Sequence, residues 1–168
     1  PLLEQYSKEY YALNPLEATQ AGVNDYNNQL EITISGEYIK KAKALNQKYL
    51  TQLVVINKAG LTASELLSID VLTYKLKSEN ERLNNSLGFY RPVDQFVFSF
   101  PTRFATLGSG AGFVPFNTEK DYRNFISRMK GFQLWVDQAI ANMRKGVVQN
   151  NTNPKAAMEK VPPQLKPL

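Results

Sequence analysis

The sequence predicts a mainly α-helical, irregular multi-helix domain. Apolar residues recur at intervals of three and four along several stretches, and residue types that cap helices precede these stretches. One long aromatic and glycine-rich segment breaks the pattern. The 168 residues are 43% hydrophobic and 21% charged, which suits one folded domain with its own core, so we expect residues 1–168 to form a single helical domain.

Two helices are predicted at the N-terminus. Leucines and tyrosines at helical spacing predict the first over residues 2–13. Asn14-Pro15 is typical of an N-cap followed by proline at the first helical position, which predicts a short helix over 16–21 that ends at Gly22.

The next two helices are predicted to be long. Apolar positions step by three and four over residues 35–56, which indicates one amphipathic helix closed by Gly60. Residues 62–65 form a capping box, because the threonine oxygen can accept an amide of the first turn while the glutamate reaches back to the cap. The helix that follows should stop near 87–88.

Helical signals resume after residue 116. Residues 117–121 combine N-cap types with acidic residues, and a three-four rhythm then predicts a long helix over 122–146, with Trp135 in the core. Asn153-Pro154 starts a last short helix, which Pro162-Pro163 should end.

Residues 89–116, here called the Phe-rich segment, are predicted to be a long loop. They hold seven of the nine phenylalanines, three prolines and the glycine run 108–112. The alternation of Phe96, Phe98 and Phe100 with other residues favours a short strand before Pro101. So many phenylalanines must pack against something or form a large exposed apolar patch.

Several chemistries are excluded by composition. The chain has no histidine and no cysteine, so it contains no imidazole base, no His- or Cys-based zinc site and no thiolate nucleophile. Its net charge of +5 tolerates an acidic partner without requiring one. Two basic stripes could contact phosphates, but acids lie close to both, so we expect solvated helix faces and no nucleic-acid partner. The stripes are Lys40, Lys41 and Lys43, and Arg123, Arg128 and Lys130.

The glycine run 108–112 admits three interpretations. It could cradle an anion, although Phe113 stands where a dinucleotide fingerprint has its last glycine. A tight turn that allows close backbone approach is the favoured interpretation, and a loop facing a ligand cavity or partner domain is the third. Ser109 lacks the flanking glycines of a nucleophile elbow.

Polar, aromatic and glycine residues of the Phe-rich segment are the candidate contacts of a cleft or an interdomain surface. Among them, Asp94, Gln95 and Arg103 need partners if they are buried, and ordinary loop exposure is the alternative interpretation. No catalytic or metal-ligating residue is expected in this chain. The candidate contacts are Asp94, Gln95, Phe98, Phe100, Arg103, Phe104, Gly108, Ser109, Gly110 and Gly112.

Two blocks of residues point to a known family. The first is Asn14-Pro15-Leu16-Glu17-Ala18-Thr19 with Gly22 and Asp25. The second is Pro115-Phe116-Asn117-Thr118, Asp121-Tyr122, Arg128, Trp135-Val136-Asp137-Gln138-Ala139-Ile140, Met143-Arg144, Gly146, Pro154 and Val161. Together they resemble the N-terminal part of the bacterial domain-of-unknown-function family eight-eight-five.

The resemblance implies a role as part of a larger protein. Members of the family resemble helical zinc peptidases, often exported or lipid-anchored, with a His-Glu-x-x-Pro-Gly-His motif in their later half. The resemblance therefore implies that this chain is a non-catalytic N-terminal domain of a metallopeptidase-like protein, exported to the periplasm or outer membrane. Its C-terminal half would be its partner and would hold the zinc, a peptide would be the substrate, and this chain itself would carry no cofactor. The resemblance also implies that the phenylalanines of the Phe-rich segment face this missing C-terminal half.

An alternative remains open, namely a free-standing helical binding module of the cell envelope without enzymatic activity. The chain begins at Pro1 rather than Met, which favours a processed piece of a longer protein. No apolar run approaches the roughly 20 residues of a membrane-spanning helix. Neither the substrate nor the oligomeric state can be derived from these residues.

Overall fold

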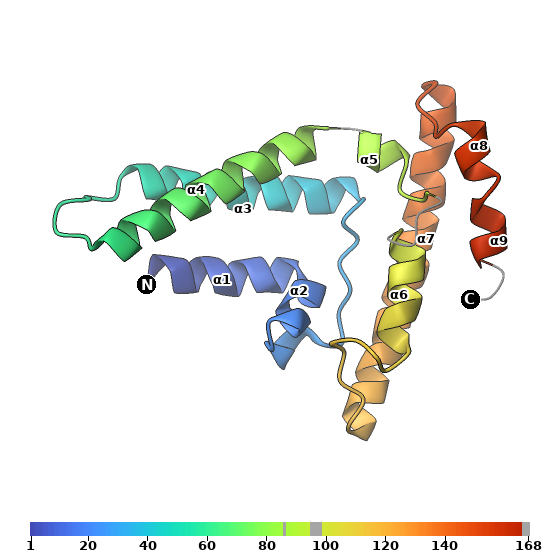
Figure 1. The fold of residues 1–168 in the computed structure, drawn as a ribbon, viewed down its shortest axis with the longest axis horizontal. Coiled ribbons are helices and arrows are strands. Elements are labelled where there is room, and N and C mark those ends of the chain that lie inside the picture. The colour runs from blue at the N-terminus through green and yellow to red at the C-terminus, as the bar shows by residue number, and fades with distance from the viewer. Residues whose placement is uncertain (86, 95–98, 166–168) are drawn as a thin grey trace.

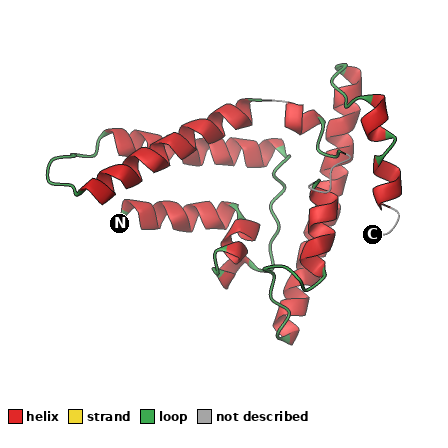
Figure 2. Cartoon of the chain, viewed as in Figure 1, coloured by secondary structure: helices red, strands yellow, loops and turns green. Residues whose placement is uncertain are grey.

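The structure is a computed structural model that describes residues 1–85, 87–94 and 99–165. Within these ranges all regular secondary structure is helical, which confirms the mainly α prediction (Figures 1 and 2). The elements are α1 (Leu2–Leu13), α2 (Pro15–Gln20), the 3-10 turn η1 (Asn24–Tyr26), α3 (Gly36–Val54), α4 (Ala63–Asn84), α5 (Leu87–Tyr90), α6 (Phe100–Gly108), α7 (Glu119–Val148), α8 (Lys155–Met158) and α9 (Val161–Leu165).

The helices form two arms that meet at one corner. Figure 1 shows α3 and α4 as a long hairpin with α1 beside it, and α7 running across the end of this group with α6, α8 and α9 next to it. An extended segment over residues 27–35, here called the strap, passes between the arms along α7. Each arm therefore has its own core, and the strap and α2 lie at the junction.

The core of the first arm packs α1 against the α3–α4 hairpin. Its rings meet where Tyr6 stands edge-on to Tyr49, with centroids 5.1 Å apart. The capping box predicted at 62–65 is present, since Glu65 N–H donates to the Thr62 hydroxyl and Thr62 N–H donates to the Glu65 carboxylate. The buried members of this core are Tyr6, Tyr49, Leu53, Ile69, Leu72 and Leu76.

The core of the second arm is aromatic and packs α6 on α7. The ring of Phe104 stacks on Phe132 with centroids 4.3 Å apart, and Phe100 lies 4.8 Å from the ring of Trp135. Trp135 is buried, as predicted. These contacts place part of the Phe-rich segment in the core of this chain.

The prediction of a continuous loop over 89–116 is wrong at residues 89–90, which end α5, and at residues 100–108, which form α6. Phe100, Phe104 and Leu107 recur at helical spacing and pack toward the core, so a helix buries them while pairing its own backbone groups. The predicted strand falls on residues 95–98, which lie outside the described residues, and Phe100 at its end is helical.

Several helix ends differ from the predictions, and α4 ends at Asn84 rather than near residues 87–88. Helix α3 stops at Val54, and Gly60 instead sits in the following loop with a φ of 84°, a conformation that favours glycine. Pro162 and Pro163 do not end the last helix, because they lie in the first turn of α9, where proline loses no helical hydrogen bond.

The end of α7 also differs, since the helix continues to Val148 and Gly146 lies inside it. A Cβ at Gly146 would approach the Asn151 carbonyl oxygen to 2.7 Å and the Tyr90 Cβ to 3.2 Å. The glycine is therefore required for close packing rather than as a C-cap. In the described part of the chain, no helix is both long and apolar enough to cross a membrane.

Candidate functional site

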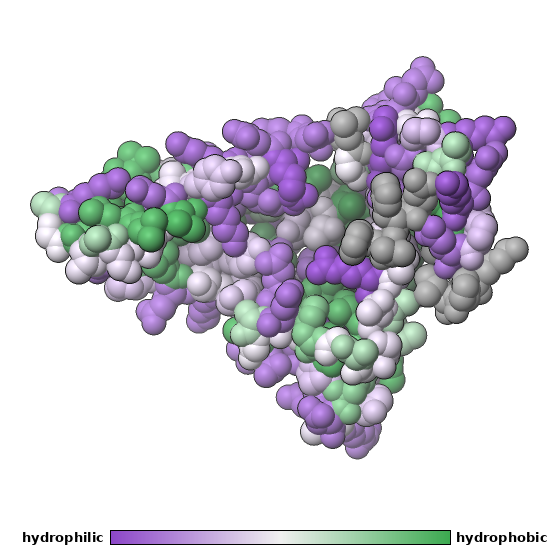
Figure 3. Space-filling model, in the orientation of Figure 1, coloured by the Kyte–Doolittle hydropathy of each residue, from purple (hydrophilic) through white to green (hydrophobic). Residues whose placement is uncertain are grey.

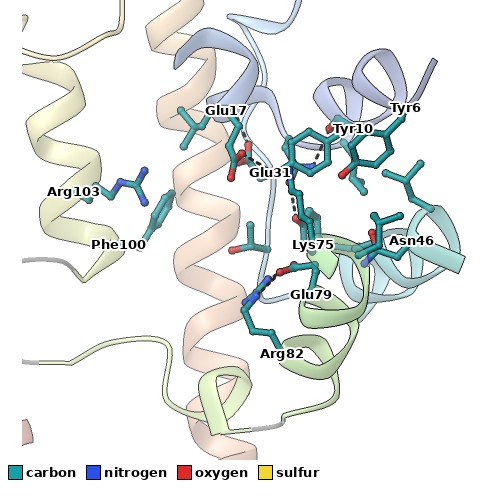
Figure 4. Close-up of a pocket in the computed structure, with 18 residues that line it drawn as sticks. Tyr6, Tyr10, Glu17, Glu31, Asn46, Lys75, Glu79, Arg82, Phe100 and Arg103 are labelled. Carbon is teal, nitrogen blue, oxygen red and sulfur yellow. Dashed lines mark hydrogen bonds and ion pairs between the residues drawn. The ribbon is translucent and has the colours of Figure 1, made fainter. Parts of the chain in front are cut away.

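A polar cavity of about 300 Å³ lies at the junction of the two arms. Its walls come from α1, α2, the strap, α3, α4 and α6, as Figure 4 shows. Both charged and aromatic side chains face it. The lining residues that the following argument uses are Tyr6, Tyr10, Asn14, Glu17, Glu31, Tyr38, Lys75, Glu79, Arg82, Phe100 and Arg103.

The wall formed by α1 and α2 is held by a chain of hydrogen bonds. The Tyr10 hydroxyl donates to Glu17 Oε2 at 2.7 Å, and the Asn14 side-chain amide donates to the Tyr10 carbonyl at 2.9 Å. The Tyr38 hydroxyl of α3 donates to Asn14 Oδ1 at 2.6 Å. Burial, and next its bond to Glu17, raise the pKa of Tyr10, so its hydroxyl stays protonated and remains a donor.

Glu31 enters the cavity from the strap. The Leu16 backbone N–H donates to its Oε2 at 3.3 Å. Burial raises the pKa of Glu31 to about 7, and the nearby Glu17 adds to this, while backbone hydrogen bonds and the charge of Arg128 act in the opposite direction. Its carboxyl group therefore changes charge near neutral pH.

Helix α4 contributes the opposite wall of the first arm. The Lys75 ammonium lies 4.1 Å from the centroid of the Tyr10 ring, which is a cation–π contact. Arg82 and Glu79 form an ion pair at 2.6 Å on the same helix. The α4 wall thus presents one cation over an aromatic ring and one neutralised pair.

Helix α6 closes the cavity with two of the predicted contact residues. Phe100 is half-buried and Arg103 is exposed, and both line the cavity. Figure 4 shows them on the side facing Glu17 and Glu31, with the Arg103 side chain extending from α6 toward the other labelled residues.

Of the other predicted contact residues, those within the described ranges do not line this cavity. Phe104 is buried against α7, and Asp94 is half-buried before the start of α6. Gln95 and Phe98 lie outside the described residues.

The glycine run after α6 forms a tight turn. A Cβ at Gly108 would approach the Phe125 ring to 2.9 Å, and Gly110 has a φ of 77°. The Ser109 hydroxyl donates to the Thr106 carbonyl at 2.7 Å and accepts from the Ala111 N–H, while Gly112 is exposed. These contacts support the interpretation as a turn with close backbone approach.

Arg128 was predicted as part of a basic stripe, and this is wrong because its side chain is fully buried. Its guanidinium donates to the carbonyls of Gln29 and Pro15 at 3.0 and 3.3 Å and to the Thr19 hydroxyl at 2.5 Å. It joins α7 to α2 and the strap, so it is unavailable to a phosphate.

Most of the cavity was missed by the sequence analysis. Tyr10, Glu17 and Lys75 fall at ordinary helical positions, and nothing in their spacing singles them out. Glu31 could have been found from one signal. It is an acid inside the apolar stretch 30–34, in a segment without helical periodicity, which is typical of a carboxylate that is buried.

Comparison with known proteins identifies the family but no function. No curated protein and no solved structure gives a significant match to this chain. The family described as bacterial protein of unknown function (DUF885) matches over residues 15–168, which include α2 to α9, the strap and most of the cavity wall. The chain therefore belongs to the DUF885 family of bacterial proteins.

Proposed function

We propose that this chain is the non-catalytic N-terminal helical domain of a metallopeptidase-like protein, in which it forms part of a substrate cleft and an interdomain surface. Two facts support the proposal. The chain belongs to the DUF885 family, and it has no histidine or cysteine with which to build a catalytic zinc site of the usual kind.

The observation that carries the proposal is an apolar stripe on α7 whose side chains remain substantially exposed. Tyr122, Ile126, Met129 and Ile140 share one face of the helix and are 55%, 54%, 54% and 39% exposed. This face points away from the buried Trp135, because the two sets differ in helical phase. A stripe of this kind on a long helix is typical of an interface.

The occupant that we propose for the α7 stripe is the C-terminal half of the same protein. That half would supply the zinc and a metal-activated water, while this domain would supply shape and contacts to a peptide. Phe100 and Arg103 would contribute those contacts, because both line the cavity at the junction. The protein would work outside the cytoplasm, in the periplasm or as an outer-membrane lipoprotein.

The test is association between this chain and the separately produced remainder of the same gene product. We expect a stable complex, detected by sedimentation and calorimetry. The double variant Ile126→Lys with Met129→Glu should weaken association at least tenfold, because it places charges in an apolar contact. The matched control is Lys145→Glu, an exposed position on another side of α7.

Two results would contradict the proposal. Either the stripe variant binds the remainder as tightly as the wild type, with circular dichroism showing that both are folded, or the two halves do not associate. A reading frame that stops directly after Leu168 would instead support a free-standing binding module of the envelope.

A further inference from the structure

The cavity at the junction is lined by unpaired charges of both signs. In the described ranges, Glu17 and Glu31 form no ion pair, and neither do Lys75 and Arg103. Beside them, Glu79 and Arg82 form an ion pair, with Arg82 Nη2 2.6 Å from Glu79 Oε1. The cavity therefore keeps two carboxylates and two cations that do not neutralise one another.

The local structure holds these charges apart. Tyr10 stands between Glu17 and Lys75. Its hydroxyl donates to the Glu17 carboxylate at 2.7 Å, and the Lys75 ammonium lies over its ring, 4.1 Å from the centroid. Glu31 is largely buried, yet it receives only neutral backbone donors, Leu16 N–H among them. A carboxylate in this setting is stabilised strongly by any cation that reaches it.

The opposite side of the cavity offers a site for an anion. Arg103 projects from α6 toward the carboxylates, and its guanidinium makes no hydrogen bond or ion pair to another described residue (Figure 4). A guanidinium is a planar fork that binds a carboxylate through two parallel hydrogen bonds. Phe100 lies beside it and adds an apolar wall.

We propose that this cavity binds a small zwitterion of the size of a free amino acid or a dipeptide. The ammonium group would lie at Glu17 and Glu31, the carboxylate at Arg103, and an apolar side chain against Leu13, Leu16 and Phe100. A simple cation would leave Arg103 unpaired, and a simple anion would leave both glutamates unpaired. A volume of about 300 Å³ lies at the small end of ligand pockets, which favours a compact ligand.

This inference extends one part of the proposed function, since both assign Phe100 and Arg103 of the same cavity to a ligand, but its test is separate from the association test. It uses the cavity between α1, α4 and α6, whereas the association test uses the outer face of α7. Either one can fail while the other stands.

The test is calorimetric titration of the 168-residue chain at pH 7 with four probes. L-leucine and the dipeptide Leu-Leu carry both charges, leucine amide lacks the carboxylate, and N-acetyl-leucine lacks the ammonium. We expect saturable binding of at least one zwitterion, and binding at least tenfold weaker for each analogue that lacks one charge. Whichever of L-leucine and Leu-Leu binds more tightly shows whether the cavity favours a free amino acid or a dipeptide.

Two variants assign the two ends of the ligand. Arg103→Met should weaken zwitterion binding about tenfold without affecting leucine amide, because that probe has no carboxylate to lose. Glu31→Gln should weaken zwitterion binding by a similar factor without affecting N-acetyl-leucine. The matched controls Arg123→Met and Glu119→Gln change an exposed pair on α7 and should leave all affinities unchanged.

The proposal is overturned if neither zwitterion gives a saturable heat. It is also overturned if the neutralised analogues bind as tightly as leucine or Leu-Leu, or if both variants weaken all probes equally. Circular dichroism of each variant distinguishes loss of binding from loss of folding.

Discussion

At the scale of single residues, burial has different effects on two ionisable side chains at the junction, Arg128 and Glu31. Arg128 is fully buried and is compensated by carbonyl and hydroxyl oxygens from α2 and the strap. Glu31 lies nearby but is not within ion-pair distance of it, so burial dominates and raises the pKa of the carboxyl to about 7. Burial lowers the pKa of Arg128 too, but a guanidinium stays charged because its ordinary pKa is so high, whereas burial leaves the glutamate near its titration point.

Glu31 is expected to make the stability of the fold fall as the pH rises from about 4.5 to about 7. Below this window the carboxyl is protonated in both states. Within it the unfolded chain releases the proton while the folded chain retains it, and above it both are ionised and the loss is complete. The loss is at most about 3 kcal/mol from the size of the shift.

The measurement is the free energy of urea unfolding at pH 4 and pH 8 for the wild type and Glu31→Gln. The variant should be the more stable protein at pH 8, and the difference should vanish near pH 4. Glu119→Gln is the control, because that side chain is exposed. An equal pH dependence in wild type and Glu31→Gln would contradict the assignment.

At the scale of elements, helix ends depend on what the helix meets as well as on its own residues. The capping box predicted at Thr62 forms, because every atom involved lies within four consecutive residues, and a second box forms at Thr118, where N-cap types and acids were predicted. Gly146 has the composition of a C-cap and lies inside α7, since the chain returns past it and Asn151 N–H donates to its carbonyl at 2.8 Å. Local sequence cannot show the approach of Tyr90, which comes from α5, to Gly146.

Gly146→Ala should destabilise the protein by about 1–3 kcal/mol, even though alanine favours helices more than glycine. The added Cβ would clash with the Asn151 carbonyl oxygen and with Tyr90, and a backbone atom cannot move aside as a side-chain tip can. Thermal and urea unfolding measure the effect.

The control for this substitution is Gly36→Ala at the start of α3, where nothing lies within 4 Å of the added Cβ. It should be neutral or stabilising by up to about 1 kcal/mol. A Gly146→Ala protein as stable as the Gly36→Ala protein would show that the close contact does not matter.

At the scale of the whole molecule, the strap ties two separate cores together. Asn142 of α7 is buried and its side-chain amide donates to the Ile34 carbonyl at 2.8 Å, while Arg128 holds Gln29. A Cβ at Gly131 of α7 would meet the Leu30 side chain at 2.9 Å, which shows how closely the strap lies on the helix.

Apolar side chains also gather at the free end of the α3–α4 hairpin and over α6, as Figure 3 shows.

We expect the two arms to unfold as one unit because of these ties. Trp135 is the single tryptophan of the sequence and lies in the α7 arm, so its fluorescence follows that arm, while far-UV circular dichroism follows all helices. The two urea transitions should coincide. In Asn142→Ala both should shift together, by about 1–3 kcal/mol, because the Ile34 carbonyl loses its donor.

Separate transitions for the two probes in the wild type would instead show two folding units. In that case residues 1–168 would not be the single domain that their composition suggests.

The sequence by itself determined the helical class, the capping box at Thr62 and the long helix that contains Trp135, because these depend on periodicity and on neighbours within a few residues. It also determined the absence of histidine and cysteine chemistry. Only the tertiary structure decided that Phe100 to Gly108 is a helix on α7, that Arg128 is buried and that Glu31 meets Glu17, Lys75 and Arg103 around one cavity. The burial of Arg128 and the cavity depend on contacts between residues tens of positions apart, which a local pattern does not record, while the helical spacing of Phe100, Phe104 and Leu107 becomes decisive only because α7 covers their face.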